Sequence, residues 1–336
     1  MALEQEKSLA VPAAALDDVV VAMAEGIFGG PGEVGRHFSG VQLRSVDMSD
    51  PVLLADSTIG ADVVMVTLQP LRAAHVRALA PSVRVIGRAG VGLDTIDLDA
   101  AKAAGITVIN QPAYGVTEVA SHAVAMLLAL QRRLGSLDAF VREGWTGPAP
   151  LSPMKALDEL VVGLIGLGRI GRATAQMLTG MVGRVIAYDP AFPPLPHGVE
   201  WASDIGSLLG CSDVVSLHVP LMPETQSMVD AGFLAAMMPG ALLVNVSRGG
   251  LVDEDALASA LESGQVGGAG LDVFGVEPLP LSSRLMDAPN TLLSPHCAAY
   301  SERSTWRLMS WTLEDTVSWV RWRTVEHGNI VVVGDR

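Results

Sequence analysis

Short hydrophobic runs recur along the chain, and stretches with helical periodicity separate them. Buried strands are predicted at residues 18–23, 61–66, 83–86, 106–110, 161–165, 184–188, 214–217, 242–246, 268–271 and 291–294. Strands that alternate with helices are typical of a parallel α/β sheet. The pattern therefore predicts an α/β protein.

Two longer apolar stretches predict helices. One begins near residue 117, has apolar positions through residue 130, and carries Arg132 and Arg133 in its last turn, where cations favour the helix dipole. Its wide apolar face predicts burial against more than one neighbour, either both domains or a second subunit. The other stretch, residues 305–325, has tryptophan and aliphatic positions whose spacing predicts core packing.

The strand at residues 161–165 continues into a glycine-rich turn and a helix. Gly166 permits a tight turn, Gly168 allows backbone to approach a pyrophosphate, and Gly171 allows close helix–strand packing. The helix N-terminus offers N–H groups to that pyrophosphate. The next strand ends in Asp189, 23 residues after Gly166, where a Rossmann unit places the carboxylate that holds ribose hydroxyls. This context favours a dinucleotide site over a chance strand–turn–helix.

Polar residues follow the later strands at their carboxyl ends, where open α/β sheets bind ligands: Arg248, Asp272, Glu277 and His296. Histidine suits proton transfer near neutral pH, and a carboxylate such as Glu277 would orient it. Arg248 offers a planar fork that matches a carboxylate. Taken singly, each has a structural alternative. Arg248 could be an ion-pair partner, Glu277 an acid in a turn, and His296 a capped histidine in a loop. Together they predict an active site.

A second glycine-containing turn, at residues 90–92, follows the strand at residues 83–86. Successive N–H groups in such a turn can form an anion-binding concavity, and a plain tight turn is an equal alternative.

Composition narrows the function classes. The chain has 336 residues, which is enough for two domains. Its composition, with 49% hydrophobic and 17% charged residues, indicates a globular protein. A net charge of −14 argues against nucleic acid or an anionic membrane as partner. Residues 1–18 have no cationic start, so we expect a frayed leader rather than a signal peptide. No apolar run reaches membrane-spanning length. Two cysteines form no disulfide framework, so a cytoplasmic location is expected.

From about residue 19 to residue 331 the chain resembles the D-isomer-specific 2-hydroxyacid dehydrogenase family. The matching stretches are residues 163–171, 218–225, 245–253, 271–278 and 294–298. Residues 118–125 and 295–300 further resemble the branch near C-terminal-binding proteins and phosphoglycerate dehydrogenases.

The resemblance implies two Rossmann-like domains with doubly wound parallel sheets. A discontinuous substrate domain would comprise residues 1–113 and 300–336, and residues 114–299 would form the NAD-binding domain. It also implies a homodimer through the nucleotide domains, NAD as cofactor, a small anionic 2-hydroxy or 2-keto acid as substrate, and no metal. The expected reaction is interconversion of a D-2-hydroxy acid and its 2-keto acid by hydride transfer.

The same resemblance assigns residues. The catalytic set would be Arg248, Glu277 and His296. The substrate carboxylate would meet the backbone of Val91 and Gly92 with Arg88 nearby, and Arg248 and His296 would also bind substrate. Adding the glycine-rich turn, the predicted cofactor-binding residues are Gly166, Gly168, Arg169, Ile170, Gly171, Asp189, His218, Val219, Pro220, Thr225, Val246, Ser247, Arg248, Asp272, His296 and Ala298.

Thr95, Ser121 and Tyr300 depart from the family pattern, which leaves the chemistry intact and the identity of the substrate open. Two alternative functions also stay open. One is an NAD(H)-sensing interaction protein like C-terminal-binding proteins. The other is oxidation of another small anion, such as a phosphono acid, formate or phosphite. NAD is expected over NADP, because Asp189 would repel a 2′-phosphate and no Lys or Arg follows it closely.

Overall fold

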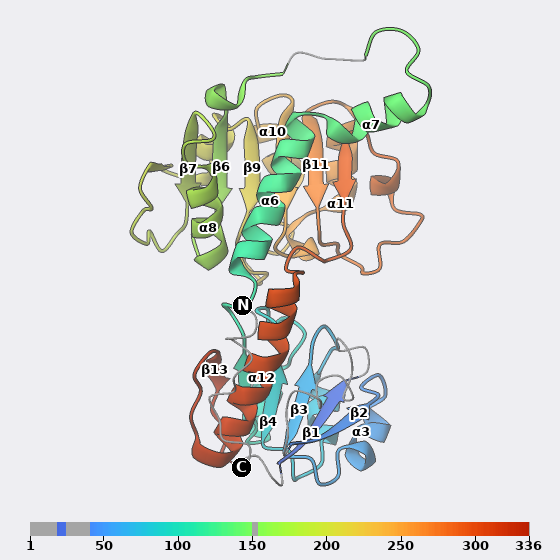
Figure 1. The fold of residues 1–336 in the computed structure, drawn as a ribbon, viewed down its shortest axis with the longest axis vertical. Helices are drawn as coiled ribbons and strands as arrows, with labels where there is room; N and C mark the ends of the chain where they lie inside the picture. Colours follow the sequence, from blue (N-terminus) through green and yellow to red (C-terminus); the bar gives the residue numbers. More distant parts are fainter. Residues whose placement is uncertain (1–18, 25–40, 150–153, 336) are drawn as a thin grey trace. The chain divides into compact units, whose positions relative to one another are not determined.

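The computed structural model describes residues 19–24, 41–149 and 154–335. The chain divides into two compact units: unit 1 comprises Met1–Gly115 and Ser301–Arg336, and unit 2 comprises Val116–Tyr300. Each unit contains one sheet with helices packed on it (Figure 1). The leader predicted for residues 1–18 lies outside the described residues.

Unit 1 is built on a six-stranded sheet with the order β13-β5-β4-β3-β1-β2. Its strands pair in parallel except β13, which is antiparallel to β5. The bounds are β1 Val19–Ala24, β2 Val41–Val46, β3 Val63–Val66, β4 Val85–Arg88, β5 Thr107–Asn110 and β13 Asn329–Val332. Strands β1, β3, β4 and β5 are wholly buried, as continuous apolar runs in a covered parallel sheet should be.

The helices of unit 1 are α3 Pro51–Ser57, α4 Ala73–Ala78, α5 Leu98–Ala103 and α12 Glu302–Trp322. The long helix α12 lies across β3 and β4 (Figure 1). It contributes Leu308, Leu313, Val317 and Trp319 to the same core as the strands. The predicted C-terminal helix is therefore confirmed as a core element, although it begins and ends three residues earlier than expected.

Unit 2 is built on a seven-stranded parallel sheet with the order β12-β11-β10-β9-β6-β7-β8. The bounds are β6 Val161–Ile165, β7 Arg184–Tyr188, β8 Val199–Trp201, β9 Val214–Leu217, β10 Ala241–Asn245, β11 Val266–Leu271 and β12 Thr291–Leu293. The chain extends the sheet from β6 towards β8 and then continues on the other side of β6 with β9. This reversal of strand order lies between β6 and β9, where a doubly wound sheet opens a ligand crevice at its carboxyl edge.

Helices cover both faces of this sheet. One core layer contains apolar residues of α6 Val116–Gln131 and α8 Arg169–Leu178, which lie side by side in front of the sheet in Figure 1. The other layer contains residues of α9 Ile205–Leu209, α10 Ala231–Ala236 and α11 Glu254–Glu262. The predicted α/β class with doubly wound parallel sheets is confirmed.

The end of α6 corrects one expectation. The helix ends at Gln131, so Arg132 and Arg133 do not lie in its last turn. Arg133 adopts a left-handed conformation with φ of 52° and precedes a further helix, α7 Leu134–Arg142. Most of the apolar face of α6 is buried within unit 2 itself, against α8 and the sheet.

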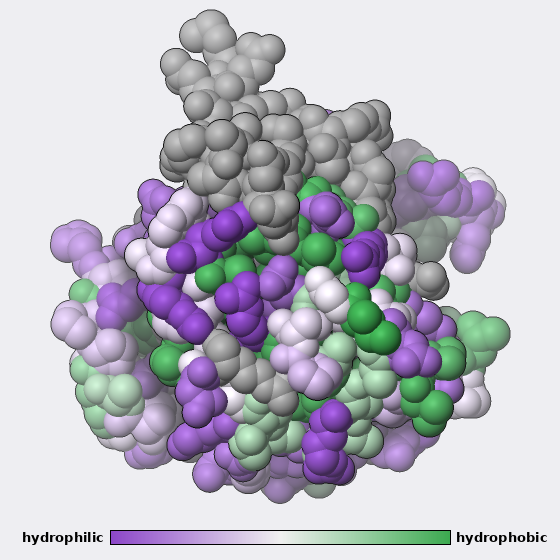
Figure 2. Space-filling view, turned by 90° about the horizontal axis from the view of Figure 1, so that it is seen from below, coloured by the Kyte–Doolittle hydropathy of each residue, from purple (hydrophilic) through white to green (hydrophobic). Residues whose placement is uncertain are grey.

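The face of the structure seen in Figure 2 mixes hydrophilic and hydrophobic residues over its coloured surface. Among the described helices, none has both the length and the apolar character needed to cross a bilayer.

Candidate active site

The glycine-rich turn joins β6 to α8 at the carboxyl edge of the unit 2 sheet. Gly166 has φ of 95°, and its N–H donates to the carbonyl of Tyr188 at 2.8 Å. A side chain at this position would collide with the backbone of His218, so glycine is required for both conformation and space. Gly168 is the N-cap of α8 and makes no side-chain cap, and a Cβ there would meet no atom within 4 Å. The turn therefore presents helix N–H groups beside open space, which fits a phosphate.

Asp189 lies directly beside this turn. Its Oδ2 accepts a hydrogen bond from the N–H of Leu167 at 2.8 Å, and its Oδ1 accepts one from Ala191 at 2.9 Å. The pairing of Ile165 with Tyr188 brings the ends of β6 and β7 together, so the acid and the turn are neighbours in space. A fixed carboxylate next to a phosphate-binding turn fits the ribose of a dinucleotide.

The segment after β9 forms the other wall of the turn. The N–H of His218 donates to the carbonyl of Ile165 at 2.7 Å, and its Nε2 lies 3.0 Å from Ser216 Oγ. Burial lowers the pKa of His218 to about 4, so its imidazole is neutral at pH 7. Thr225 Oγ1 donates to the carbonyl of Pro220 at 2.7 Å and closes the following loop. Val219 lies between them and packs against the core of the unit.

Arg248 follows β10 in a short, well-braced loop. Val246 is buried, and Ser247 Oγ donates to the carbonyl of Leu217 at 2.8 Å. Asn245 Nδ2 donates to the carbonyl of Arg248 at 2.8 Å, and the Arg248 guanidinium donates to the carbonyl of Ser247 at 2.7 Å. These bonds hold the arginine at the carboxyl edge of the sheet, beside the strand end that carries His218.

His296 and Glu277 form a hydrogen-bonded pair at the same edge. His296 Nδ1 lies 2.7 Å from Glu277 Oε2, and Glu277 Oε1 accepts the N–H of Phe274 at 3.0 Å. The side chains are 28% and 30% exposed, so the pair is anchored yet open to a small molecule. With Nδ1 held by the carboxylate, the ring presents Nε2 for proton exchange.

Asp272 fixes the loop that carries His296. Its side chain is 1% exposed. It accepts hydrogen bonds from the Ser294 hydroxyl at 2.5 Å and from the N–H groups of Cys297 and Ala298 at 2.9 and 2.8 Å. Its carbonyl also accepts the N–H of His296 at 2.8 Å. This carboxylate therefore ties β11 to the loop after β12 and sets the position of the histidine.

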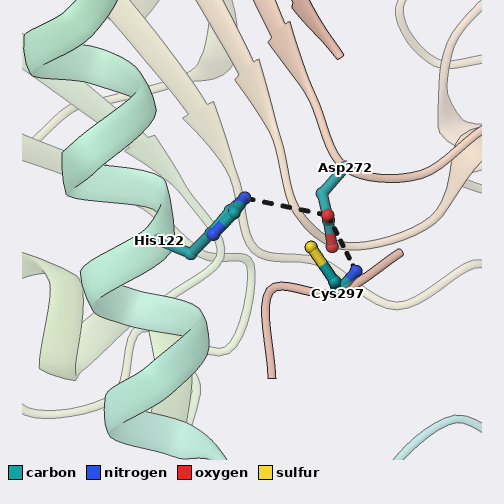
Figure 3. A group of neighbouring side chains, drawn as sticks. All are labelled: His122, Asp272 and Cys297. Atoms are coloured by element: carbon teal, nitrogen blue, oxygen red, sulfur yellow. Dashed lines mark hydrogen bonds and ion pairs between the residues drawn. The ribbon is translucent and has the colours of Figure 1, made fainter. Parts of the chain in front are cut away.

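His122, Asp272 and Cys297 lie together, with potential metal-ligand atoms within 4.8 Å of one another. Figure 3 shows His122, from α6, pointing towards the Asp272 carboxylate, with Cys297 beside it. Two of these side chains already share the Ser294 hydroxyl, which is 3.0 Å from His122 Nε2 and bonded to Asp272. Burial, followed by the nearby Asp272 charge, raises the pKa of the Cys297 thiol and favours its protonated form. We therefore interpret the cluster as a hydrogen-bonded brace, and the absence of a metal stays a prediction.

The predicted substrate residues Arg88, Val91 and Gly92 lie in unit 1, where Arg88 is the last residue of β4 and the other two follow that strand. The Arg88 side chain is 4% exposed. Its guanidinium donates to the carbonyl of Gly92 at 2.9 Å and also to that of Ala89. Val91 is 42% exposed, so the turn itself reaches the surface.

Several positions in these networks were not predicted. Ser294 and His122 support Asp272, and Asn110 donates to the carbonyl of Val91 at 2.7 Å. Each is a polar residue inside or next to an otherwise apolar element, which is the only sequence signal that marks it. The predicted residues of unit 2 all lie on segments that follow the carboxyl ends of its parallel strands or begin α8.

Comparison with known proteins gives a family. Residues 124–298 match the family model described as D-isomer specific 2-hydroxyacid dehydrogenase, NAD binding domain. The chain is 39% identical over 272 residues to D-3-phosphoglycerate dehydrogenase of Mycobacterium bovis, which covers 80% of this chain and 51% of that protein. It is 35% identical to glycerate dehydrogenase of Methylorubrum extorquens, covering 80% and 85% of the two chains.

Among solved structures, an NADPH-dependent glyoxylate/hydroxypyruvate reductase from Sinorhizobium meliloti, in complex with NADP and malonate, matches with a TM-score of 0.85. It is 29% identical in sequence, and the match covers 95% of this chain and 99% of that one. The phosphoglycerate dehydrogenases are longer proteins, and the chain spans about half the length of those curated relatives.

Proposed function

Because the chain belongs to the D-isomer specific 2-hydroxyacid dehydrogenase family, we propose that it interconverts a small D-2-hydroxy acid and its 2-keto acid with NAD(H). The observation that carries the proposal is the His296–Glu277 pair, held 2.7 Å apart at the sheet edge that also carries the dinucleotide turn. Relatives named glycerate dehydrogenase and hydroxypyruvate reductase favour a hydroxy acid substrate over an interaction protein or another small anion.

NAD fits the residues of unit 2. Gly168 and the first turn of α8 would meet the pyrophosphate, and Asp189 would hold the ribose hydroxyls. The loop residues Val219, Pro220, Thr225, Val246, Ser247, Asp272 and Ala298, with Arg169, Ile170 and His218, are proposed to line the remainder of this site. The cofactor, when bound, supplies or accepts a hydride.

The proton is handled by this chain. In keto-acid reduction, His296 donates a proton from Nε2 to the substrate oxygen, and in the reverse direction it accepts one there. Glu277 holds Nδ1, which fixes the orientation of the ring and balances the charge of its protonated form. Arg248 offers its fork to the substrate carboxylate and polarises the adjacent carbonyl. Val91 and Gly92 are proposed as substrate-binding residues of unit 1, because successive backbone N–H groups in such a turn can bind an anion.

Two further parts of the proposal concern assembly and location. We propose that unit 2 is the NAD-binding domain, that unit 1 is the substrate domain, and that the protein is a homodimer. The surface that supports a dimer is α7, since none of its residues is buried against the described part of the chain. Leu134, Val141 and the nearby Trp145 are 55%, 52% and 66% exposed. Two unpaired cysteines support a cytoplasmic location.

A panel of 2-keto acids followed by NADH absorbance tests the function. Hydroxypyruvate, glyoxylate, pyruvate and 3-phosphohydroxypyruvate are assayed with NADH and with NADPH. Turnover of at least one of them, abolished by His296→Gln, is the expected result. NADH binding without turnover of any member of the panel would contradict the proposal and favour the interaction-protein alternative.

A further inference from the structure

The proposed proton donor, His296, stands in a strained segment of backbone. Its φ is 52°, a left-handed conformation that is uncommon for any residue except glycine. Such a conformation persists only where the surrounding structure holds it. Asp272 holds it, because its carbonyl accepts the N–H of His296 at 2.8 Å. The Asp272 carboxylate also accepts the N–H groups of Cys297 and Ala298 at 2.9 and 2.8 Å. The direction in which the imidazole points therefore depends on how firmly Asp272 is held.

Two further hydrogen bonds hold the Asp272 carboxylate from the side of α6. Ser294 Oγ donates to Asp272 Oδ1 at 2.5 Å, and His122 Nε2 lies 3.0 Å from the same Ser294 oxygen. A serine hydroxyl has one proton, and here that proton goes to the carboxylate. Ser294 can then only accept from His122, so His122 Nε2 carries a proton and donates it. The bonds run in one direction, from His122 through Ser294 to Asp272, and each polarises the next.

The packing of α6 on the sheet places His122 at this point. Met126 of α6 lies over Gly270 of β11, where a Cβ would lie 3.0 Å from the Met126 Cβ, so glycine lets the helix approach closely. His122 comes one helical turn before Met126, and Asp272 comes two residues after Gly270. The two side chains therefore meet where β11 ends (Figure 3). His122 Nε2 is 3.7 Å from Asp272 Oδ1, and the Asp272 side chain is 1% exposed. The helix thus supplies a donor beside a carboxylate that would be costly to bury without partners.

We propose that His122 is a positioning residue. Through Ser294 and Asp272 it holds His296 in the orientation from which Nε2 exchanges a proton with the substrate, and it touches neither substrate nor cofactor itself. The inference rests on the proposed function for the role of His296. It gives α6, whose buried residues are all apolar, a part in the reaction beyond packing.

Variants at His122 separate the hydrogen bond from the packing. His122→Leu loses the donor, and kcat for a turned-over keto acid should fall about tenfold, the change expected from one broken bond in a buried network. His122→Gln can place an amide N–H near the position of Nε2 and should recover most of this loss. The KM for the keto acid and the Kd for NADH should change less than kcat, because the proton is transferred in the transition state. The solvent deuterium isotope effect on kcat should rise in His122→Leu, since a misdirected imidazole slows proton transfer relative to the other steps.

A second variant and a matched control complete the kinetic test. Ser294→Ala breaks the same chain of bonds at its middle and replaces His122→Leu if that variant does not fold. Because the two residues act through one chain, combining both changes should cost little more than Ser294→Ala alone. The control is Ser121→Ala, since Ser121 precedes His122 on α6, is exposed, and donates to the carbonyl of Glu118 at 2.9 Å. It should keep the native kcat and the native isotope effect.

A measurement that needs no turnover separates this inference from the proposed function. In protein with isotope-labelled histidine, the proton that His296 Nδ1 shares with Glu277 gives a nuclear magnetic resonance signal, which Glu277→Gln identifies. His122→Leu and Ser294→Ala should shift or broaden this signal, and Ser121→Ala should leave it unchanged.

Each outcome bears on one claim. In a chain that reduces a keto acid, a native kcat in His122→Leu and Ser294→Ala would overturn the inference. A loss of kcat matched by an equal loss of NADH affinity, with an unchanged isotope effect, would overturn it as well. If the native chain reduces no keto acid, the proposed reaction fails and the resonance decides. A changed signal in both variants then supports the link from His122 to His296, and an unchanged signal refutes it.

Discussion

Removing the proton-handling pair one member at a time tests the assigned chemistry most directly. His296→Gln keeps a polar side chain and loses the titrating ring. Because a positioned general acid contributes about 10²–10⁴-fold in rate, kcat should fall by a factor in this range. NADH should still bind, since the turn at Gly166 and the acid Asp189 are untouched.

The magnitude for Glu277→Gln follows from its contacts. The variant keeps an acceptor for the Phe274 N–H and loses the charge that faces His296 Nδ1 at 2.7 Å. A hydrogen bond to a charged group is worth about 1.5–3 kcal/mol, which corresponds to about ten- to a hundredfold in rate. Nearly a third of each side chain is exposed, so solvent screens the pair, and we expect the lower end of this range.

The assay is NADH oxidation under saturating keto acid for both single variants and the double variant. If the two residues act as a unit, the double variant should lose little more than His296→Gln alone. Glu254→Gln is the matched control, because this carboxylate accepts the N–H of Gly275 in the same loop at 2.7 Å. The assignment would be refuted if the factors by which the two single variants lower kcat multiply in the double variant. A near-native kcat for His296→Gln would refute it as well.

Three further predictions concern the cofactor, the assembly and stability. The native enzyme should have a higher kcat/KM with NADH than with NADPH, and Asp189→Ala should narrow that ratio; faster native turnover with NADPH would contradict the role of this acid. Light scattering of the full chain should give a dimer mass, and Val141→Asp on α7 should shift it towards the monomer, whereas a native monomer would exclude the dimer. A hydrogen bond to Glu314 raises the pKa of His327, so protonated His327 stabilises the folded state. This contribution to the free energy of unfolding is complete below the usual pKa of histidine and is lost as pH rises through the raised pKa. Thermal melts of Glu314→Gln should show a larger loss at about pH 5.5 than at about pH 9, and equal losses at both would contradict this linkage.

The parts of the fold that the sequence predicted are those with continuous apolar runs. Central strands such as β4, β6 and β10 are covered on both faces, so nearly every residue in them is apolar. Strands β2, β8 and β13 lie at sheet edges and are partly exposed, and the sequence pattern did not reveal them. Helix α7 was missed because it has no buried face and its boundary with α6 depends on one left-handed residue, Arg133.

The candidate site shows the same division between local and long-range information. The turn at Gly166 and the acid that follows β7 could be predicted because a short stretch of chain contains both. The support of Asp272 by His122 and Ser294 joins residues 172 positions apart along the chain, and no local pattern connects them. The burial of Arg88 and its bonds to the carbonyls of Ala89 and Gly92 are likewise visible only in the structure.

Unit 1 is built from two chain segments with unit 2 between them, and this has a consequence for folding during synthesis. On the ribosome, residues 116–300 emerge before α12 and β13, which complete the core and the edge of unit 1. Unit 2 can therefore finish folding first, although its sequence comes second. Until Leu313 and Val317 arrive, the nascent strands of unit 1 lack a cover for one apolar face. The strands of unit 1 that precede residue 116 thus wait longer than those of unit 2 for the helix that completes their core, which prolongs the exposure of their apolar surface.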